Sequence, residues 1–204
     1  MKKSIIFFFL MIQLCANAQS TRPIADVSQK YKKTSIKLNP FGLLIRRYSL
    51  ALEYTLDNKS ALELEFAYMN FSIKTGKEKD TVVSIVGSRL ALNYRYYLGK
   101  KRKPLKGFYV SPFIEYLSTS LSVRRDTITN PGTTVGITSY GIGSNFGYQW
   151  VFGDAISLDI YGGLGYLYSV VDNINRTMVL PNSRNSRPFT GLLPNVSIKV
   201  GYCF

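Results

Sequence analysis

Hydrophobic and polar residues alternate with a period of two over most of this chain. In the last segment, apolar side chains stand at every second position: Val196, Ile198, Val200, Tyr202 and Phe204. This period places successive side chains on opposite faces of a β-strand. The same alternation predicts eight strands, over residues 34–44, 48–56, 61–73, 83–98, 107–121, 135–152, 155–170 and 192–204. No helical period competes with it, so we expect one all-β domain.

Charge is confined to one face of these predicted strands. Nine ionisable residues lie within them, and all nine alternate away from the aliphatic and aromatic face: Lys37, Glu53, Glu63, Glu65, Arg89, Arg95, Glu115, Asp159 and Lys199. In a soluble sandwich or lipocalin-like barrel, the apolar face would point inward. In an outer-membrane barrel the apolar face points into lipid and the polar face into the lumen.

Three features favour the lipid-facing arrangement. Aromatic residues of the apolar face gather near predicted strand ends, as in interfacial girdles: Phe108, Tyr116, Tyr140, Tyr148, Trp150 and Phe152. Glycines on the other face suit a narrow, crowded lumen: Gly141, Gly143, Gly147, Gly163 and Gly165. Phe204 is in phase with the apolar face and resembles the C-terminal signature of bacterial outer-membrane barrels. That resemblance implies the barrel-assembly machinery as a partner, through the C-terminal strand.

We therefore predict an eight-stranded antiparallel up-and-down transmembrane β-barrel over residues 34–204. Backbone N–H and C=O groups in hydrocarbon must be paired, so the first and last strands must close the sheet. Eight strands enclose a lumen that side chains can fill, so no open pore is expected. The inward charges persist there only if paired, and Glu53, Glu63 or Glu65 should face Arg89 or Arg95 across neighbouring strands. An ion or proton path, or a buried acid pair for hydrolysis, is the functional alternative to this structural plug.

The N-terminal residues have the three parts of a secretory signal peptide. Lys2 and Lys3 precede an apolar stretch over residues 5–12, and Ala16-Asn17-Ala18 forms a small-residue cleavage site. The sequence thus predicts a signal peptide over residues 1–18, a periplasmic tail over residues 19–33, and location in the cell outer membrane. Cleavage would leave Cys203 as the single cysteine.

The candidate chemistry is sparse. The chain has no histidine, so catalysis by a Ser-His-Asp or Cys-His group, the usual zinc site and a His-ligated haem are excluded. The glycine-rich residues 141–143 and 162–165 lie within predicted strands, and without a following helix they are not phosphate loops. We expect no catalytic residue, no cofactor and no metal site.

The chain carries a formal net charge of +14, and its basic residues lie mainly outside the predicted strands. One group, at positions 100–103 and 106, belongs to a predicted periplasmic turn. A second group lies in the outward loops and could contact lipopolysaccharide phosphates: Lys74, Lys77, Lys79, Arg124, Arg125, Arg176, Arg184 and Arg187. A nucleic-acid partner is not expected outside the cytoplasm, and a monomer is expected.

Four short segments carry a family resemblance. Residues 37–40 (KLNP), 50–54 (LALEY), 94–98 (YRYYL) and 106–110 (KGFYV) resemble the DUF3575 group of exported proteins from Bacteroidetes-type bacteria. The resemblance implies a small outer-membrane barrel without an assigned activity, so no functional residues are carried over. We expect a structural or surface-interaction protein. The alternatives are a lipid-modifying outer-membrane enzyme, which in comparable barrels relies on histidine, and a soluble lipocalin-like ligand-binding barrel.

Overall fold

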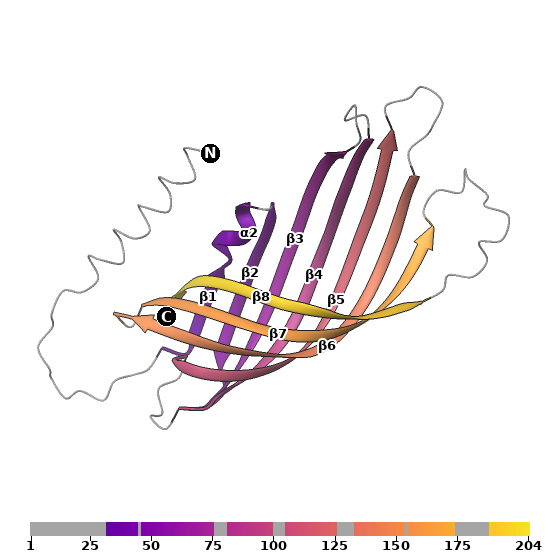
Figure 1. Ribbon diagram of the computed structural model, residues 1–204. Helices are drawn as coiled ribbons and strands as arrows, with labels where there is room; N and C mark the ends of the chain where they lie inside the picture. Colours follow the sequence, from indigo (N-terminus) through magenta and orange to yellow (C-terminus); the bar gives the residue numbers. More distant parts are fainter. Residues whose placement is uncertain are drawn as a thin grey trace, which may run out of the picture.

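The computed structural model describes residues 32–44, 46–75, 81–99, 105–125, 133–153, 155–173 and 188–204. Eight strands close into one barrel, in which each strand pairs antiparallel with its neighbours in sequence and β1 pairs with β8 (Figure 1). Their bounds are β1 Thr34–Leu38, β2 Arg47–Thr55, β3 Ser60–Thr75, β4 Thr81–Tyr97, β5 Gly107–Arg125, β6 Thr133–Phe152, β7 Ile156–Asn173 and β8 Phe189–Cys203. The predicted fold class is confirmed.

In the described part of the chain, no helix is both long and apolar enough to cross a membrane. The predicted signal peptide, and the predicted tail up to residue 31, lie outside the described residues. Both therefore stay predictions.

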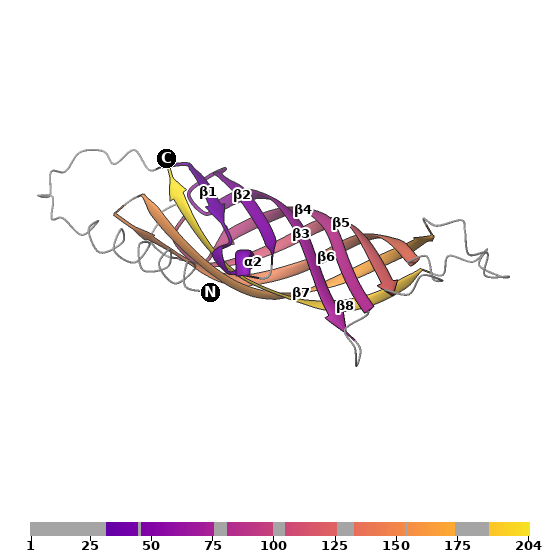
Figure 2. The same cartoon turned by 90° about the horizontal axis from the view of Figure 1, so that it is seen from above.

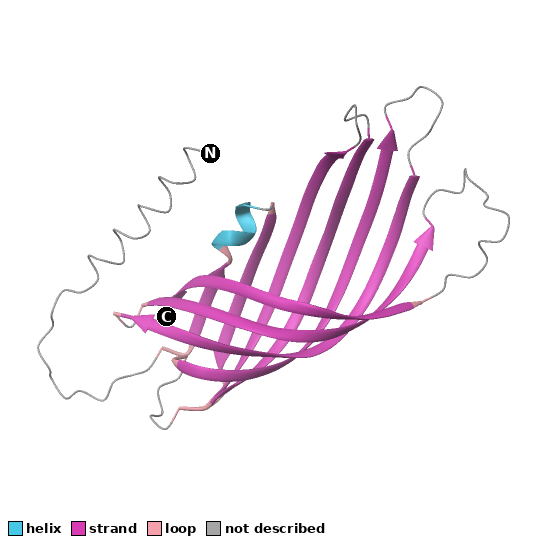
Figure 3. Ribbon diagram, in the orientation of Figure 1, coloured by secondary structure: helices cyan, strands magenta, loops and turns pink. Residues whose placement is uncertain are grey.

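The prediction of a first strand over residues 34–44 is wrong in its second half. β1 ends at Leu38, and a short helix, α2 (Pro40–Leu44), follows it (Figure 3). The Oδ1 atom of Asn39 accepts a hydrogen bond from the Gly42 backbone N–H at 2.9 Å and so caps the helix. Pro40 fits the first helical position because it has no N–H to leave unpaired. The connection to β2 is therefore this helix rather than a short turn.

The first hairpin is consequently much shorter than the others. β3 to β7 extend well beyond β1, α2 and β2 at one end of the barrel (Figures 1 and 2). Most of these strands also run further than predicted at that end: β3 continues to Thr75, β5 to Arg125 and β7 to Asn173. The alternation of apolar outward residues, on which the prediction depended, is lost there, because hydroxyl side chains such as Ser72, Ser84 and Ser118 take many of the outward positions.

Each strand pair keeps the same register at both ends of its ladder. Since every register relates residues of equal parity, odd-numbered residues of all eight strands face the lumen and even-numbered residues face outward. Glu63 and Arg95 are each 1% exposed, whereas Phe146 is 64% exposed and Tyr94 is 42% exposed. The predicted inversion, with the apolar face outward and the ionic face inside, is confirmed for this part of the barrel.

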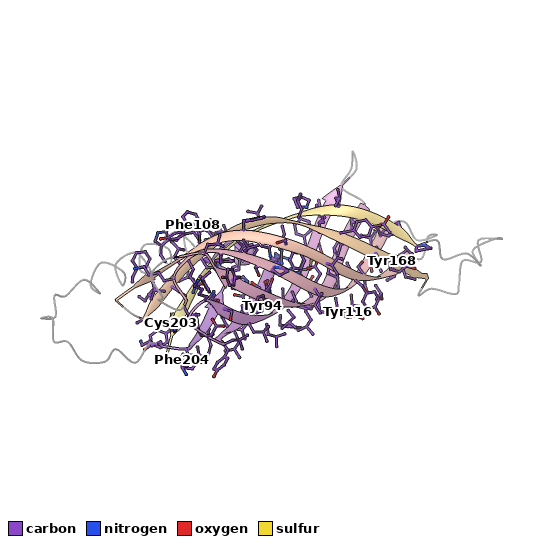
Figure 4. All side chains as sticks on the ribbon, turned by 90° about the horizontal axis from the view of Figure 1, so that it is seen from below. Tyr94, Phe108, Tyr116, Tyr168, Cys203 and Phe204 are labelled. Atoms are coloured by element: carbon purple, nitrogen blue, oxygen red, sulfur yellow. The ribbon has the colours of Figure 1, made fainter. Side chains whose placement is uncertain are left out.

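Aromatic side chains on the outward face form belts near two levels of the barrel. Figure 4 shows Phe108 and Phe204 near one end, and Tyr116 and Tyr168 toward the other. The Phe108 and Tyr148 rings meet edge to face at a centroid distance of 4.5 Å, and the Tyr116 and Tyr140 rings lie 5.4 Å apart. This arrangement agrees with the predicted interfacial girdles.

Candidate functional site: the ionic network in the barrel interior

Charged side chains fill the lumen in the half of the barrel nearer its short turns. The Lys37 ammonium from β1 lies 2.6 Å from Glu53 Oε2, 3.0 Å from Asp159 Oδ2 and 3.3 Å from Glu63 Oε2. It also donates a hydrogen bond to Gln149 Oε1 at 2.9 Å. One lysine therefore joins side chains from β2, β3, β6 and β7, which no single strand pair could do.

Arg95 connects opposite walls of the barrel from β4. Its Nη2 atom lies 2.6 Å from Glu63 Oε2 and its Nη1 atom 2.7 Å from Asp159 Oδ2, and Nη1 also approaches Glu53 at 3.6 Å. The guanidinium is centred 4.4 Å from the ring centroid of Tyr109, a cation–π geometry. A planar group with five donors is suited to hold several carboxylates at once.

Lys199 and the two glutamates of β3 continue the network. The Lys199 Nζ atom lies 2.8 Å from Glu63 Oε1 and 2.8 Å from Glu65 Oε2. Glu63 thus contacts three cations, Lys37, Arg95 and Lys199, and no other carboxylate in the described network contacts more.

The network ends at a more exposed group nearer the long-strand end of the barrel. Arg89 Nε lies 2.5 Å from Glu115 Oε2, and Arg89 Nη1 lies 3.1 Å from Glu65 Oε1. Arg47 approaches Glu65 only to 3.8 Å, and its side chain is 31% exposed. All the other charged side chains of the network are at most 10% exposed.

All nine charged residues singled out in the sequence take part in these contacts. The expected pairing across neighbouring strands is confirmed for Glu63 with Arg95 and for Glu65 with Arg89. Glu53 also approaches Arg95, although β2 and β4 are not neighbours. With Arg47 included, five cations face five carboxylates, so the described network is electrically balanced.

Sequence reasoning missed the neutral members of the network. Tyr97 donates a hydrogen bond to Glu53 at 2.7 Å, Tyr109 donates to Asp159 at 2.6 Å, and Tyr161 donates to Glu65 at 3.4 Å. Gln149 bridges Lys37, Arg95 and Glu53. Their odd-numbered strand positions were the available signal, because a tyrosine or glutamine in phase with buried charges is placed to partner them.

Glycines make room for the bulky inward side chains. A Cβ atom at Gly147 would stand 2.5 Å from the Tyr109 ring, and one at Gly143 would stand 2.6 Å from the Phe113 ring. A Cβ atom at Gly141 would approach Glu115 to 2.7 Å. These distances are shorter than van der Waals contact, so β6 lies close behind the side chains of β5. The expectation of a narrow, crowded lumen is confirmed here.

A cavity of about 230 Å³ lies just above the network, toward the long-strand end. Its charged lining comes from Arg47, Arg89 and Glu115, and its apolar lining includes Met69 and Leu117. The cavity is therefore bounded by the ionic network on one side and by apolar side chains on the other.

Several sequence expectations concern residues around this interior. Residues 141–143 and 162–165 lie within β6 and β7, as expected for segments that are not phosphate loops. Among the described residues, no group of His, Cys, Asp and Glu is arranged to hold a metal ion. The basic group at positions 100–103 lies outside the described residues, as do the side chains of the outward basic loops.

Solved structures of small barrels are similar to this chain. Ail, the attachment invasion locus protein of Yersinia pestis, is 10% identical over 85% of this chain and 99% of its own, with a TM-score of 0.49. The N-terminal β-barrel domain of Pseudomonas aeruginosa OprF is 12% identical over 85% and 98%, with a TM-score of 0.43. CarO of Acinetobacter baumannii is 12% identical over 87% and 100%, with a TM-score of 0.46.

No curated protein matches the sequence. A family match, in contrast, extends over nearly the whole chain and includes all four segments that carried the resemblance. The match covers residues 5–204, and the chain belongs to the family described as "Protein of unknown function (DUF3575)".

Proposed function

We propose that this protein is a small outer-membrane β-barrel with a structural or surface-interaction role and with no open pore. The observation that carries the proposal is the network around Arg95, which contacts Glu63 and Asp159 from opposite walls of the lumen. An ion crossing the lumen would have to separate these pairs. Breaking a buried ion pair costs about 3–5 kcal/mol, so the closed arrangement is strongly favoured.

The outward face supports a lipid environment for the barrel wall. Ile142 is 62% exposed and Phe146 is 64% exposed, and on β6 both lie between the outward aromatic residues Tyr140 and Tyr148. In water, exposed apolar surface of this kind is unfavourable by about 25 cal/mol per Å². In lipid the same surface is at no disadvantage. A soluble lipocalin-like barrel would place these residues inside and Glu63 outside.

Membrane fractionation tests the location. The full-length protein, expressed in its own secretory context, is expected in the outer-membrane fraction. An unheated sample should also migrate differently from a boiled one on a gel, as folded barrels do. Recovery of the folded protein in the soluble periplasmic fraction would overturn the proposed location.

Conductance in planar lipid bilayers tests the closed lumen. The wild-type protein is expected to insert without stable ion steps, and Arg95→Ala is expected to introduce steps because it removes the bridge between Glu63 and Asp159. Ile142→Leu, an outward change, is the matched control and should stay silent. Steady wild-type conductance would contradict a closed lumen. The conductance of Arg95→Ala is compared with that of the wild-type protein only if the gel shift shows that the variant folds into a barrel.

A non-enzymatic role is supported by the pairing of the interior charges. Each of the nine predicted charged residues contacts a group of opposite charge, so the acidic and basic side chains of the interior are ion-paired with one another. Such an arrangement stabilises a closed lumen and leaves these groups little freedom to react.

The partners proposed from the sequence are outer-membrane lipids, lipopolysaccharide and the barrel-assembly machinery, with the protein as a monomer. The lipopolysaccharide proposal rests on the charge of the outward loops. It is tested by neutralising Arg124, Arg125, Arg176, Arg184 and Arg187 together. Unchanged lipopolysaccharide association would count against it. The bacterial group expected from the resemblance stays a prediction.

A further inference from the structure

The lumen changes character beyond Arg89 and Glu115. Many of the next inward positions toward the long-strand end are apolar, among them Met69, Phe71, Ile85, Leu117, Leu121 and Ile137. Thr119 and the hydrogen-bonded pair Ser139 and Ser169 are polar inward positions at the same levels. None of these side chains is fully buried within the described structure, and Phe71 is 37% exposed. The outer part of the barrel is therefore a cup whose inner wall is mainly apolar and partly accessible. We call it the outer cup.

The outward positions of the same segments are mainly polar on β3, β5 and β6, whereas Val86 on β4 and Val170 on β7 are apolar. Ser72 and Ser84 hydroxyls lie 2.9 Å apart on β3 and β4, and Ser122 and Thr134 hydroxyls lie 3.0 Å apart on β5 and β6. Ser118 is likewise outward and exposed. In the outer cup the wall is thus mainly polar outside on β3, β5 and β6 and mainly apolar inside, the reverse of the membrane-facing part. Soluble barrels that bind an apolar ligand have this arrangement, with polar side chains outside and apolar side chains inside.

The cavity described above forms the floor of the outer cup, and it also reaches the outward face. Met69 and Leu117 line it from inside, whereas Tyr68 and Val196 line it from even-numbered, outward positions. Val196 is 74% exposed. A cavity with both kinds of lining passes through the wall between β3 and β8.

The short first hairpin explains this side passage. β2 pairs with β3 only as far as Met69, and β1 pairs with β8 only from Val200 onward. Among the described residues, α2 is the one element that occupies the wall between β2 and β8 beyond these points. The outer segments of β3 and β8 consequently have no strand between them.

Arg47 lies at this passage, and of the described interior cations it has the weakest ion-pair contact and the most exposed side chain. Among the described residues it has one ion-pair contact, to Glu65, which is 3.8 Å long, and its side chain is 31% exposed. Arg89, by comparison, is held by Glu115 and Glu65 and is 10% exposed. The Arg47 guanidinium is therefore free to receive an additional anionic group beside the apolar wall.

We propose that the outer cup binds one long-chain fatty acid, with the carboxylate on Arg47 and the acyl chain along the apolar inward side chains. A single chain is proposed because, among the described cations that line the cavity, Arg47 has the longest ion-pair contact, and the apolar inward side chains of β3 and β5, such as Met69 and Leu117, lie beside it. The passage between β3 and β8 gives the ligand a route from the lipid phase. The charged network below closes the lumen, so the fatty acid is bound rather than conducted.

Photo-crosslinking tests the position of the ligand. The full-length barrel in phosphatidylcholine nanodiscs is incubated with a diazirine derivative of palmitic acid, irradiated, and mapped by mass spectrometry. Saturable labelling of inward residues such as Leu117 and Leu121, removed by unlabelled palmitate, is the expected result. Labelling confined to outward residues such as Ile142 would mean annular lipid contact and would overturn the proposal.

Matched variants test the two halves of the site. Leu117→Asp places a charge on the apolar inner wall and should weaken palmitate binding about tenfold or more. Ser118→Asp, one position along on the outward side, should leave it unchanged. Equal losses in the two variants would overturn the site. Folding of each is checked by the gel shift.

Arg47→Gln tests the head-group contact. It should weaken palmitate binding about tenfold and leave binding of hexadecanol, which lacks the charge, unchanged. Equal loss for both ligands would overturn the assigned role of Arg47. If the wild-type protein showed no saturable palmitate binding, the outer cup would not be a ligand site. The proposed closed lumen would stand in either case, because conductance reports on the network below.

Discussion

Glu63 and Arg95 meet diagonally across β3 and β4. In the strand register Glu63 lies opposite Asn93 and Arg95 lies opposite Ala61, yet Arg95 Nη2 reaches to 2.6 Å from Glu63 Oε2. Ala61, which is fully buried, leaves space beside Arg95. The pair therefore depends on a small residue at one register position as well as on the two charges.

Removal of the Glu63 charge should destabilise the barrel strongly. Glu63→Gln leaves Lys37, Arg95 and Lys199 without a carboxylate that all three contact, and the expected loss is about 3–5 kcal/mol of unfolding free energy. Urea unfolding in detergent, followed by gel shift, measures the loss. Glu115→Gln, which removes a carboxylate with one cation partner, should cost less. The reverse order would contradict the central place given to Glu63.

A methyl group at Gly147 should disturb the interior. Its Cβ would lie 2.5 Å from the Tyr109 ring, so Gly147→Ala must displace the side chain that donates to Asp159. The expected cost is about 1–3 kcal/mol of unfolding free energy. Gly162→Ala on β7 is the control, because its Cβ would meet nothing closer than 3.9 Å. Equal stability of the two variants would show that β6 does not pack closely against Tyr109.

On the proposed outer-membrane location, a charge on the outward apolar band should be costly in a bilayer. Ile142→Lys is expected to lose about 2–4 kcal/mol of unfolding free energy in phospholipid vesicles, because the lysine lies between the aromatic belts of β6. Ser118→Lys, beyond Tyr116 on β5, should be close to neutral. If Ile142→Lys were also neutral in vesicles, the outward band would not be in contact with lipid.

The turn between β2 and β3 should depend on an ionised Asp57. The Ser60 hydroxyl donates to Asp57 at 2.6 Å, and this bond, with those from the Lys59 and Ser60 backbone N–H groups, lowers the pKa of Asp57 below its ordinary value. The stabilisation is present above the ordinary carboxyl pKa and is lost as the pH falls through the lowered value. Carbon-13 NMR titration of Ser60→Ala should show the Asp57 pKa moving upward. An unchanged pKa would rule out the Ser60 contact as its cause.

The alternation of residues predicted the strands, the inward charges and the Glu63–Arg95 pair, because each depends on parity and on neighbouring strands. The contact of Arg95 with Asp159 could not be predicted in this way, since β4 and β7 are not neighbours and the barrel radius decides their separation. The helix α2 was missed although Asn39-Pro40 is a recognisable helix start. The outer cup was missed because one sense of alternation was assumed for whole strands.

Parity also limits how the wall of this barrel can change during evolution. No described ladder shifts register along its length, so each strand has one sequence of inward and outward positions from end to end. A single-residue insertion within a strand would turn every residue beyond it to the opposite side, moving charges such as Asp159 to the outward, apolar face. Tolerated length changes within strands should therefore come in pairs of residues, and odd ones should be restricted to the connections.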